Sequence, residues 1–328
     1  MKNKNLKIVI LVSIVIPSLI LISTVGLDDN KNDFPTSHFI SETIHVESFP
    51  IGISIDPITN MIYVANNNSD TISVIDGKTN LVKGEIKVGD GPAGVSVNPK
   101  TNMIYVANYY SDTISVIDGK TNVVVKEIPV DNTPWGIDVD SGNNIIYITN
   151  YLSNTISIID EAKDGIVTTV KTDKPWGIDV DSGTGYVFVA NRDSTNISAL
   201  KNGQIENITI SETPVRINPY DVSYNEKTNL LYVTNTNLIS VIDISTNKIL
   251  EPISVGKNLS GIGINANTNM IYATDIVKDV LYVIDGSTNM IKDEIKVGDH
   301  PILLEVNPKT NTIYVVNEYS NSISVISN

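Results

Sequence analysis

The chain contains no cysteine, few aromatic residues and a deficit of basic residues. Zero cysteines among 328 residues exclude disulfides, thiolate metal sites and thiol catalysis together. Lys and Arg number 23 against 37 Asp and Glu, which gives a net charge of −14. Because nucleic-acid binding depends on clustered basic side chains, we expect no nucleic-acid partner. The two tryptophans and three histidines are so few that the position of each one is informative.

Histidine is placed where it supports little chemistry. His38, His45 and His300 are far apart in the sequence, which has no Ser-His-Asp arrangement, His-rich zinc motif or phosphate-binding glycine loop. The sequence therefore favours a protein that is not an enzyme and has no cofactor, although catalysis is not excluded. If the chain is an enzyme, His300 and Arg216 are the first candidates in the loops.

Only one long apolar run is present, and it lies near the N-terminus. Three lysines within the first seven residues precede the uncharged run from Ile8 to Val25, and Asp28 and Asp29 follow it. This charge order directs the N-terminus to the cytoplasm and the rest of the chain outside. The run is 18 residues long, between the length of a signal-peptide core and that of a spanning helix. We therefore expect residues 1–26 to be a signal peptide or a membrane anchor, and the protein to be extracellular or at the cell surface.

Residues 27–40 are polar and lack periodicity, so we predict a flexible tether there. From residue 41 a motif near 101–108, Thr-Asn-Met-Ile-Tyr-Val-Ala-Asn, recurs to the end of the chain. Its central aromatic residues are Tyr63, Tyr105, Tyr147, Phe188, Tyr232, Tyr272 and Tyr314, spaced 40 to 44 residues apart. A self-similar period of this length indicates a repeat architecture.

Each repeat has the pattern of four short strands. In the second repeat, alternating or β-branched segments at 94–98, 103–107, 113–118 and 123–130 are separated by Asn-Pro and Asp-Gly turns. Four short antiparallel strands per repeat predict a β-propeller blade, and seven copies predict an all-β, seven-bladed β-propeller over residues 41–328.

The two ends of the chain predict how the ring closes. The last repeat stops after its third strand, at 322–326, and lacks a fourth. Residues 43–46 precede Pro50 with the same spacing by which 85–88 precede Pro92. We therefore expect this N-terminal strand to complete the last blade and to remove the sheet edges of an open ring.

The repeated motif resembles that of a known family. The Tyr-Val-Ala-Asn and Tyr-Val-Thr-Asn cores, the following Asp-Thr-Ile-Ser-Val-Ile-Asp and the intervening Gly-Pro-x-Gly look like the YVTN family of β-propeller repeats. The resemblance covers roughly residues 41–328 and implies an exported protein similar to archaeal surface-layer components. The family is also similar in fold to lactonase-type and haem-d1-type propellers, which are enzymes. The shared motif is structural, so no catalytic residue carries over with it.

Residues that recur in every repeat are expected to be structural. The Asn that ends each second strand, for example Asn66 and Asn108, is predicted to cap loop amides. The recurring Tyr is predicted to pack between blades.

The repeats differ mainly in the loops of one face, which we call the variable face: the loops between second and third strands and the connections between blades. After the Pro that opens each first strand, two repeats have a tryptophan and one a tyrosine. Together with nearby loop residues, the candidate binding set is Trp135, Trp176, Tyr220, Tyr109, Tyr110, Tyr151 and Arg192. Such a cluster suits a protein partner or a glycan. The alternative is that these aromatics only plug the mouth of the channel.

A second candidate site lies inside the ring. The polar middle position of the first strand is acidic at Asp138, Asp179 and Glu305, and Glu305 is expected to face the other two across a seven-fold ring. Three carboxylates suit Ca²⁺ or a shared proton. The alternative is a hydrated acidic channel that is too wide for coordination.

Four sequons begin at Asn67, Asn196, Asn207 and Asn258 and are possible glycosylation sites. The leading hypothesis is an exported, non-enzymatic propeller that binds a cell-surface protein or glycan through the variable face. The alternatives are a lactonase- or lyase-like enzyme that uses the acidic channel, and a purely structural envelope component.

Overall fold

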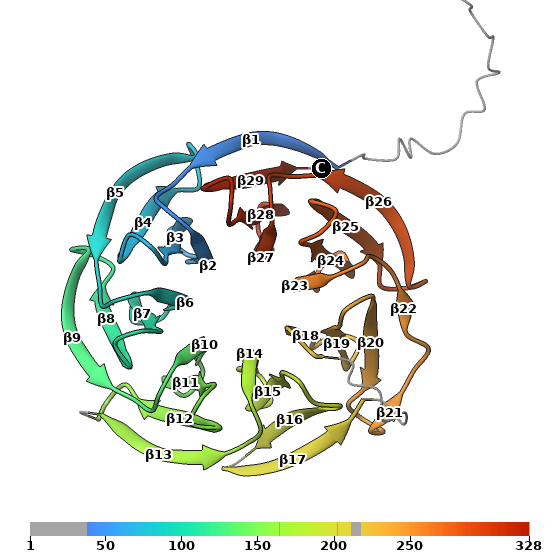
Figure 1. The fold of residues 1–328 in the computed structure, drawn as a ribbon, viewed down its shortest axis with the longest axis horizontal. Coiled ribbons are helices and arrows are strands. Elements are labelled where there is room, and N and C mark those ends of the chain that lie inside the picture. The colour runs from blue at the N-terminus through green and yellow to red at the C-terminus, as the bar shows by residue number, and fades with distance from the viewer. Residues whose placement is uncertain (1–37, 164, 202, 211–217, 328) are drawn as a thin grey trace, which may run out of the picture. The chain divides into compact units, whose positions relative to one another are not determined.

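In a computed structural model, residues 38–163, 165–201, 203–210 and 218–327 are described. Within them 29 strands form seven sheets arranged around a central axis (Figure 1). The predicted all-β, seven-bladed propeller with four antiparallel strands per blade is therefore confirmed. Among the described residues no helix is long and apolar enough to cross a membrane. The apolar run from Ile8 to Val25 and most of the expected tether lie outside the described residues.

The blades follow one another along the chain, each running from an innermost strand to an outermost one. Blades 1 to 3 are β2 (Pro50–Ile55), β3 (Met61–Asn66), β4 (Thr71–Asp76) and β5 (Leu81–Lys87); β6 (Pro92–Asn98), β7 (Met103–Asn108), β8 (Thr113–Asp118) and β9 (Val123–Pro129); and β10 (Pro134–Asp140), β11 (Ile145–Asn150), β12 (Thr155–Asp160) and β13 (Ile166–Lys171). Blades 4 and 5 are β14 (Pro175–Asp181), β15 (Tyr186–Asn191), β16 (Asn196–Lys201) and β17 (Gln204–Thr209); and β18 (Val222–Asn225), β19 (Leu230–Thr234), β20 (Leu238–Asp243), β21 (Lys248–Ile249) and β22 (Ile253–Ser254). Blades 6 and 7 are β23 (Leu259–Asn265), β24 (Met270–Asp275), β25 (Val280–Asp285) and β26 (Met290–Lys296); and β27 (Pro301–Asn307), β28 (Thr312–Asn317) and β29 (Ser322–Ser327) with β1 (Phe39–His45).

The ring is closed by the N-terminal strand, as predicted. β1 pairs antiparallel with β29, from Phe39 opposite Ser327 to His45 opposite Ser322. It begins at Phe39, so the last two residues of the tether expected over 27–40 belong to the strand. The reason is that the pairing with β29 extends farther toward the N-terminus than the alternating pattern of the sequence.

Blade 5 is the least regular blade. Its outermost strand is divided into β21 and β22, which pair separately with β20. Pro252 lies between the two pieces, and a proline has no N–H to donate to a sheet ladder. The innermost strand β18 is also short, with only four residues.

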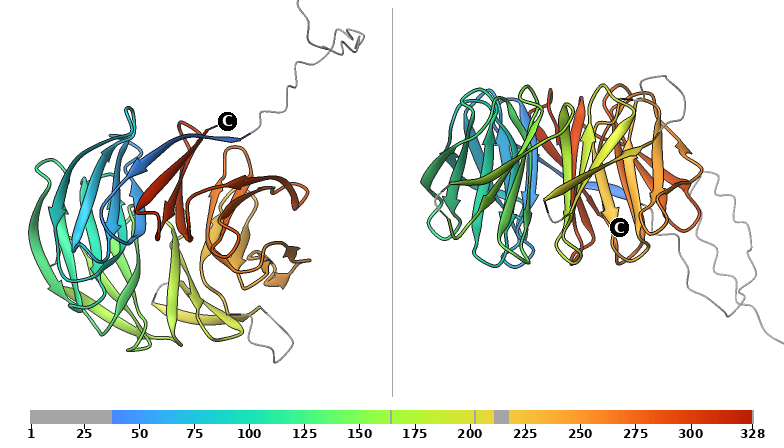
Figure 2. Two further views of the ribbon diagram at one scale, coloured as in Figure 1. Left: turned by 45° about the horizontal axis from the view of Figure 1, so that its top comes forward. Right: turned by 90° about the horizontal axis from the view of Figure 1, so that it is seen from below.

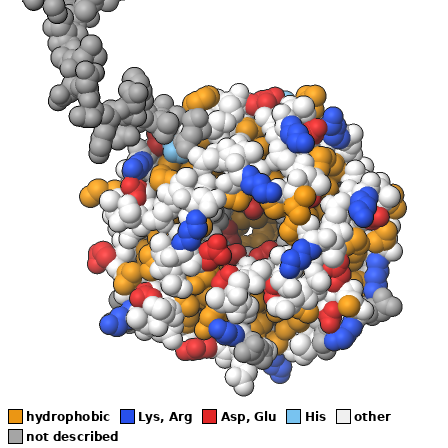
Figure 3. Space-filling view, turned by 180° about the vertical axis from the view of Figure 1, so that it is seen from behind, with side chains coloured by type: hydrophobic (Ala, Val, Ile, Leu, Met, Phe, Trp, Pro, Cys, Tyr) orange, Lys and Arg blue, Asp and Glu red, His pale blue; other side chains and the backbone are white. Residues whose placement is uncertain are grey.

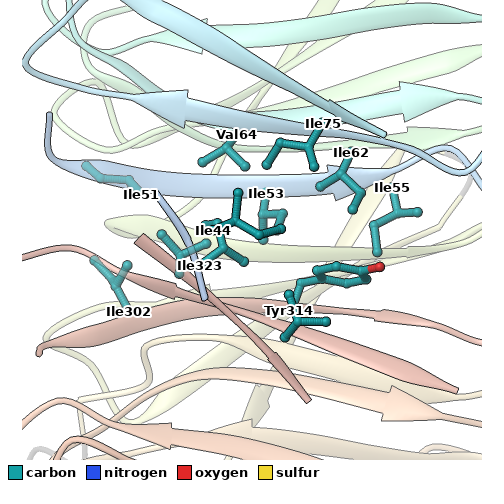
Figure 4. Packing of buried hydrophobic residues seen from close by; sticks show 12 residues of the cluster. Ile44, Ile51, Ile53, Ile55, Ile62, Val64, Ile75, Ile302, Tyr314 and Ile323 are labelled. Carbon is teal, nitrogen blue, oxygen red and sulfur yellow. The ribbon is translucent and has the colours of Figure 1, made fainter. Parts of the chain in front are cut away.

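The hydrophobic core lies between the blades. Tyr63 of blade 1 packs in one cluster with Val95 and Val97 of blade 2. Tyr314 of blade 7 packs with Ile53 and Ile55 of blade 1 (Figure 4). The prediction that the recurring Tyr packs between blades is confirmed, and it explains why every repeat keeps a large aromatic residue there.

The prediction for the recurring Asn is wrong. Asn108 is fully buried, and its Nδ2 donates hydrogen bonds to the hydroxyls of Thr113 and Ser115 on the next strand. It therefore fastens two strands of its own blade instead of capping a loop. Asp275, which replaces Asn in blade 6, accepts hydrogen bonds from loop N–H groups, including that of Lys257 at 2.6 Å. The reason is chemical: a carboxylate only accepts, whereas an amide buried beside hydroxyls donates.

Strands run between two faces of a disc (Figure 2). We call the face with the turns between first and second strands and between third and fourth strands the turn face. Its turns place Asn residues at positive φ, as at Asn102 (60°) and Asn122 (56°), a conformation that Asn tolerates well. The variable face, with its less regular loops, lies at the opposite ends of the strands.

Candidate functional site: the channel and its mouth

A cavity of about 340 Å³ occupies the centre of the ring and is lined by the first strand, or the residues just before it, in all seven blades. Seen from the turn face, the hollow contains acidic and hydrophobic side chains (Figure 3). The size is that of a small-molecule site, so the side chains that enter it decide what it can hold.

Glycines let the innermost strands approach one another. A Cβ added at Gly94 would lie 2.3 Å from the carbonyl oxygen of Trp135 in the next blade, and one at Gly52 would lie 2.1 Å from that of Ala93. The glycine of the Pro-x-Gly motif therefore permits the close approach of these neighbouring blades. Blades 5 and 7 have Asp221 and Leu303 at this position instead, and both line the cavity.

Three aspartates in the channel join neighbouring blades. Asp138 of blade 3 accepts a hydrogen bond from the backbone N–H of Val180 in blade 4 at 2.8 Å. It also accepts one from the Ser96 hydroxyl at 3.0 Å. Asp179 of blade 4 in turn accepts one from Tyr224 N at 2.6 Å.

Asp221 continues the series from blade 5 to blade 6, because its carboxylate accepts a hydrogen bond from Ile262 N at 3.1 Å. Asp221 was not among the residues expected from the sequence, because it occupies the glycine position of its repeat and not the polar middle position of the first strand. The signal was present, since Asp221 breaks the Pro-x-Gly motif.

Glu305 is the fourth carboxylate of the channel, and it has no hydrogen-bond partner among the described residues. Its pKa is raised to about 8 by burial and by the negative charges of Asp138, Asp179 and Asp221. Burial likewise raises the pKa of Asp221 to about 7 and raises those of Asp138 and Asp179 above their usual range. The four groups therefore retain protons at pH values where carboxylates in water have lost them.

Metal binding receives no geometric support. Within the described ranges, no three His, Cys, Asp or Glu side chains are placed so that they could hold a metal ion. Asp138, Asp179 and Glu305 do line one cavity, as expected, but their recorded partners are N–H and O–H donors or none.

The aromatic residues form one stack at the mouth of the channel. Trp135 and Trp176 stack with ring centroids 3.9 Å apart, and Tyr109 and Tyr151 meet them edge-on. The guanidinium of Arg192 lies over the Trp176 ring, 4.2 Å from its centroid. Trp176 thus has Trp135 and Arg192 against its ring, a combination of stacking and cation–π contact.

Most of this stack is internal. Trp176 is only 5% exposed, and Trp135 packs against a core cluster that includes Ile51 and Ile302. These contacts agree with the alternative that the tryptophans plug the channel mouth. Tyr110 is different, because it is 68% exposed while its ring rests edge-on against Tyr109.

Leu152 was not singled out from the sequence, yet it is 65% exposed in the β11–β12 loop, next to Tyr151. Tyr220, which precedes β18, meets Trp176 at 5.8 Å between centroids and is also covered by Arg192. The predicted aromatic set is therefore brought together, with Tyr110 as its exposed member and Leu152, outside the set, exposed on a loop of the neighbouring blade.

The opposite side of the variable face has a smaller cluster. His300 Nδ1 and Glu318 Oε2 lie 2.5 Å apart, and the imidazole stacks on Tyr319, 4.2 Å between centroids. Burial lowers the pKa of His300 and raises that of Glu318 to about 7, so both side chains are shifted toward their neutral forms. Arg216 lies outside the described residues.

The four sequons differ in accessibility. Asn207 is exposed on the outermost strand β17. Asn67 is buried, and its Nδ2 donates to the carbonyl oxygen of Pro92. Asn196 and Asn258 are half-buried. Asn207 therefore offers the most open position for a glycan.

Comparison with known proteins shows the fold and nothing finer. No family model and no curated protein matches the sequence. A solved structure of Kuenenia stuttgartiensis hydrazine synthase is similar with a TM-score of 0.77 and 19% identity, over 87% of this chain and 97% of that chain. At such identity a shared fold does not transfer function, so the chain is a seven-bladed β-propeller structurally similar to that protein, and the resemblance to YVTN repeats stays a prediction.

Proposed function

We propose that the chain is an exported, non-enzymatic propeller that binds a protein partner through its variable face. The observation that carries this proposal is the pair Tyr110 and Leu152, which are exposed on loops of neighbouring blades and follow Tyr109 and Tyr151 of the aromatic stack. Tyrosine is enriched among interface hot spots, and a side chain on a pre-ordered base loses little conformational entropy on binding.

A protein partner is favoured over a glycan by the arrangement of the rings. A sugar stacks on an open aromatic face, but the Trp176 ring is in contact with Trp135 and Arg192. The most exposed side chains near the stack are Tyr110 and Leu152, on loops of neighbouring blades, and they suit apolar residues of a partner.

The enzyme alternative rests on the raised pKa of Glu305, a property of many catalytic acids. The neighbouring aspartates have a sufficient structural explanation in the hydrogen bonds between blades. A lactonase- or lyase-like activity would thus depend on Glu305 alone, and Glu305→Gln would abolish it.

Export and attachment to the membrane are supported by the N-terminal sequence. Lysines, an uncharged run from Ile8 to Val25 and then aspartates are the order that sends the remainder of a chain outside. We include in the proposal that the run is retained as an anchor, because it exceeds the usual length of a signal-peptide core.

The test is photo-crosslinking from position 110 of the full chain at the cell surface, followed by titration of the captured partner. We expect Tyr110→Ala combined with Leu152→Ala to weaken binding at least tenfold. Tyr319→Ala combined with Val277→Ala is the matched control, since these residues are similarly exposed, at 61% and 59%, on other blades of the same face.

Unchanged binding by the first double variant would refute the proposal. Binding that disappears when the partner is deglycosylated would identify a glycan ligand. Crosslinks to copies of this chain alone would favour the structural envelope component.

A further inference from the structure

The exposed hydrophobic side chains are distributed unevenly between the two faces. Eleven of the fifteen large hydrophobics exposed in the described part of the chain lie toward the turn face; only Tyr110, Leu152, Val277 and Tyr319 lie toward the variable face. We call the eleven the apolar band: Phe39, Ile40, Ile58, Leu81, Val82, Val123, Val125, Ile249, Leu250, Met290 and Ile291. These residues belong to five different blades, so it is their shared position at one face, and not a single patch, that calls for an explanation.

The pairing register places the band at one edge of the disc. Leu81 lies opposite Asp76, Val123 opposite Asp118 and Met290 opposite Asp285, and each of these aspartates begins a turn of the turn face. Phe39 lies opposite Ser327 at the same end of blade 7. Ten of the eleven residues therefore sit where an outermost strand meets the turn face, and Ile58 sits in a turn.

The same strands become polar toward the other face. β5 reads Leu-Val-Lys-Gly-Glu-Ile-Lys and β26 reads Met-Ile-Lys-Asp-Glu-Ile-Lys, with the charged residues after the apolar start. β1 changes from Phe-Ile to Ser-Glu-Thr in the same direction. Neither turn geometry nor core packing requires exposed apolar residues at one end only, so the gradient points to an apolar environment at the turn face.

Basic side chains accompany the band. Lys83 and Lys292 follow it on β5 and β26 and are more than half exposed while they pair with Asp76 and Asp285. On the turn face itself, lysine side chains lie near the central hollow and along the rim, interspersed with hydrophobic and acidic side chains (Figure 3). Long basic side chains beside apolar ones are typical of a surface that meets lipid headgroups.

We propose that the turn face of the propeller rests on a lipid bilayer, with the apolar band in the headgroup region and the variable face directed away from it. This inference rests on the proposed N-terminal anchor. β1 starts at the turn face with Phe39, and the thirteen residues 26–38 separate it from the apolar run. Fully extended, they span at most about 45 Å, so an anchored propeller remains close to the membrane, and its link to the anchor leaves from this face.

The tether also explains why weak contacts between the apolar band and lipid are enough to hold the turn face on the membrane. A short link converts membrane contact into an intramolecular event at high effective concentration. Each buried apolar side chain then adds to binding without the cost of bringing the protein to the surface. The same orientation leaves Tyr110 and Leu152 accessible to a partner.

Because the chain has no cysteine, single substitutions allow clean labelling. The full chain is reconstituted into vesicles of phosphatidylcholine and phosphatidylglycerol with an environment-sensitive fluorophore at Leu81→Cys or Met290→Cys. Leu152→Cys and Val277→Cys, similarly exposed on the variable face, are the matched controls. We expect a blue shift and quenching by lipid-attached quenchers for the first pair only, and a smaller blue shift at Leu81→Cys when Val123→Ser and Met290→Ser are added.

Equal signals from both pairs, or stronger ones from the controls, overturn the inference while flotation of the chain with the vesicles still supports the anchor. A chain that does not float overturns the anchor and the inference together. A blue shift without lipid that grows with protein concentration would assign the band to a second copy of the chain and also overturn the inference.

Discussion

The carboxylate of Asp138 in blade 3 accepts a hydrogen bond from the backbone N–H of Val180 in blade 4, at 2.8 Å. Asp179 and Asp221 repeat this relationship with Tyr224 and Ile262 of the following blades. Three consecutive blade junctions are thus joined inside the channel by acidic side chains. Their position in a cavity suggests ligand binding, but their hydrogen bonds show a structural role, since each satisfies a backbone donor that would otherwise be unpaired.

The contribution of these junctions is measurable at Asp221. At pH 6 its side chain is largely neutral, given a pKa of about 7. Asp221→Ala at that pH leaves the N–H groups of Val222 and Ile262 without their acceptor. We expect the free energy of unfolding to fall by about 1–3 kcal/mol, with faster amide exchange at both residues. Asp299→Ala, on an exposed loop, is the control, and an equal effect of the two substitutions would rule out the structural role.

Stability should fall as the pH rises from about 4 to about 8. The pKa of Glu305 is raised to about 8 and that of Asp221 to about 7, so between these limits the folded state binds more protons than the unfolded state. Unfolding is then favoured by each increase in pH. Urea titrations at pH 5, 6.5 and 8 check this, and a protein that becomes more stable over this range would contradict it.

The substitution Glu305→Gln measures the effect of Glu305 on stability separately from that of the three aspartates. The substitution removes a buried charge that has no hydrogen-bond partner in the described structure, so it should stabilise the protein at pH 8 and have little effect at pH 5. The pKa of Glu305 is raised from 4.5 to about 8 and one pKa unit corresponds to about 1.4 kcal/mol, so we expect a gain of about 3–5 kcal/mol at pH 8. The same gain at both pH values would show that charge is not the cause.

The sequence predicted the propeller, its seven blades and its closure because these follow from repetition, and the repeat is long and regular. The register also located Asp138, Asp179 and Glu305 in the channel correctly. Asp221 was missed because it replaces a glycine, a position where no side chain was expected. The partners of the carboxylates were invisible as well, since a hydrogen bond to the next blade depends on a spacing between strands that no single repeat encodes.

The exposure of the aromatic residues could not be predicted either. Trp176 and Tyr110 are both aromatic residues of the variable face, yet one is 5% and the other 68% exposed. The difference arises from Arg192, in the loop after β15, and Trp135, in β10 of the preceding blade, which cover Trp176 only in the folded ring.

A side chain at the glycine of the Pro-x-Gly motif should destabilise the contact between neighbouring blades. In Gly94→Ala the new Cβ would meet the carbonyl oxygen of Trp135 at 2.3 Å, and backbone must move to relieve the overlap. We expect a loss of about 1–3 kcal/mol, as for overpacked cores, measured by thermal or urea denaturation. Gly84→Ala is the matched control, since nothing lies within 4 Å of its added Cβ; equal losses would show that the glycine is not needed for packing.

Ring closure is expected to depend on β1. Deletion of residues 38–49 removes the partner of β29 and leaves the edge of that strand unpaired, which favours aggregation. We expect the truncated chain to elute as aggregates in size-exclusion chromatography and to melt at a much lower temperature. Deletion of residues 27–35 keeps β1 and should leave the melting temperature unchanged. A monomeric 38–49 deletion with normal melting would disprove closure by this strand.

Replacement by alanine should lower the free energy of unfolding strongly at Trp176 and hardly at all at Tyr110. Trp176→Ala opens a cavity between Trp135 and Arg192, and replacing a buried tryptophan by alanine typically costs about 3–5 kcal/mol. Tyr110→Ala removes an exposed ring and should change stability by no more than about 0.5 kcal/mol. Urea denaturation of both variants measures the contrast. If Trp176→Ala unfolds normally, the stack is not structural and its rings are available to a ligand. If the contrast holds, loss of binding in a Trp176 variant reflects damage to the fold, and only substitutions at Tyr110 and Leu152 report on the binding surface.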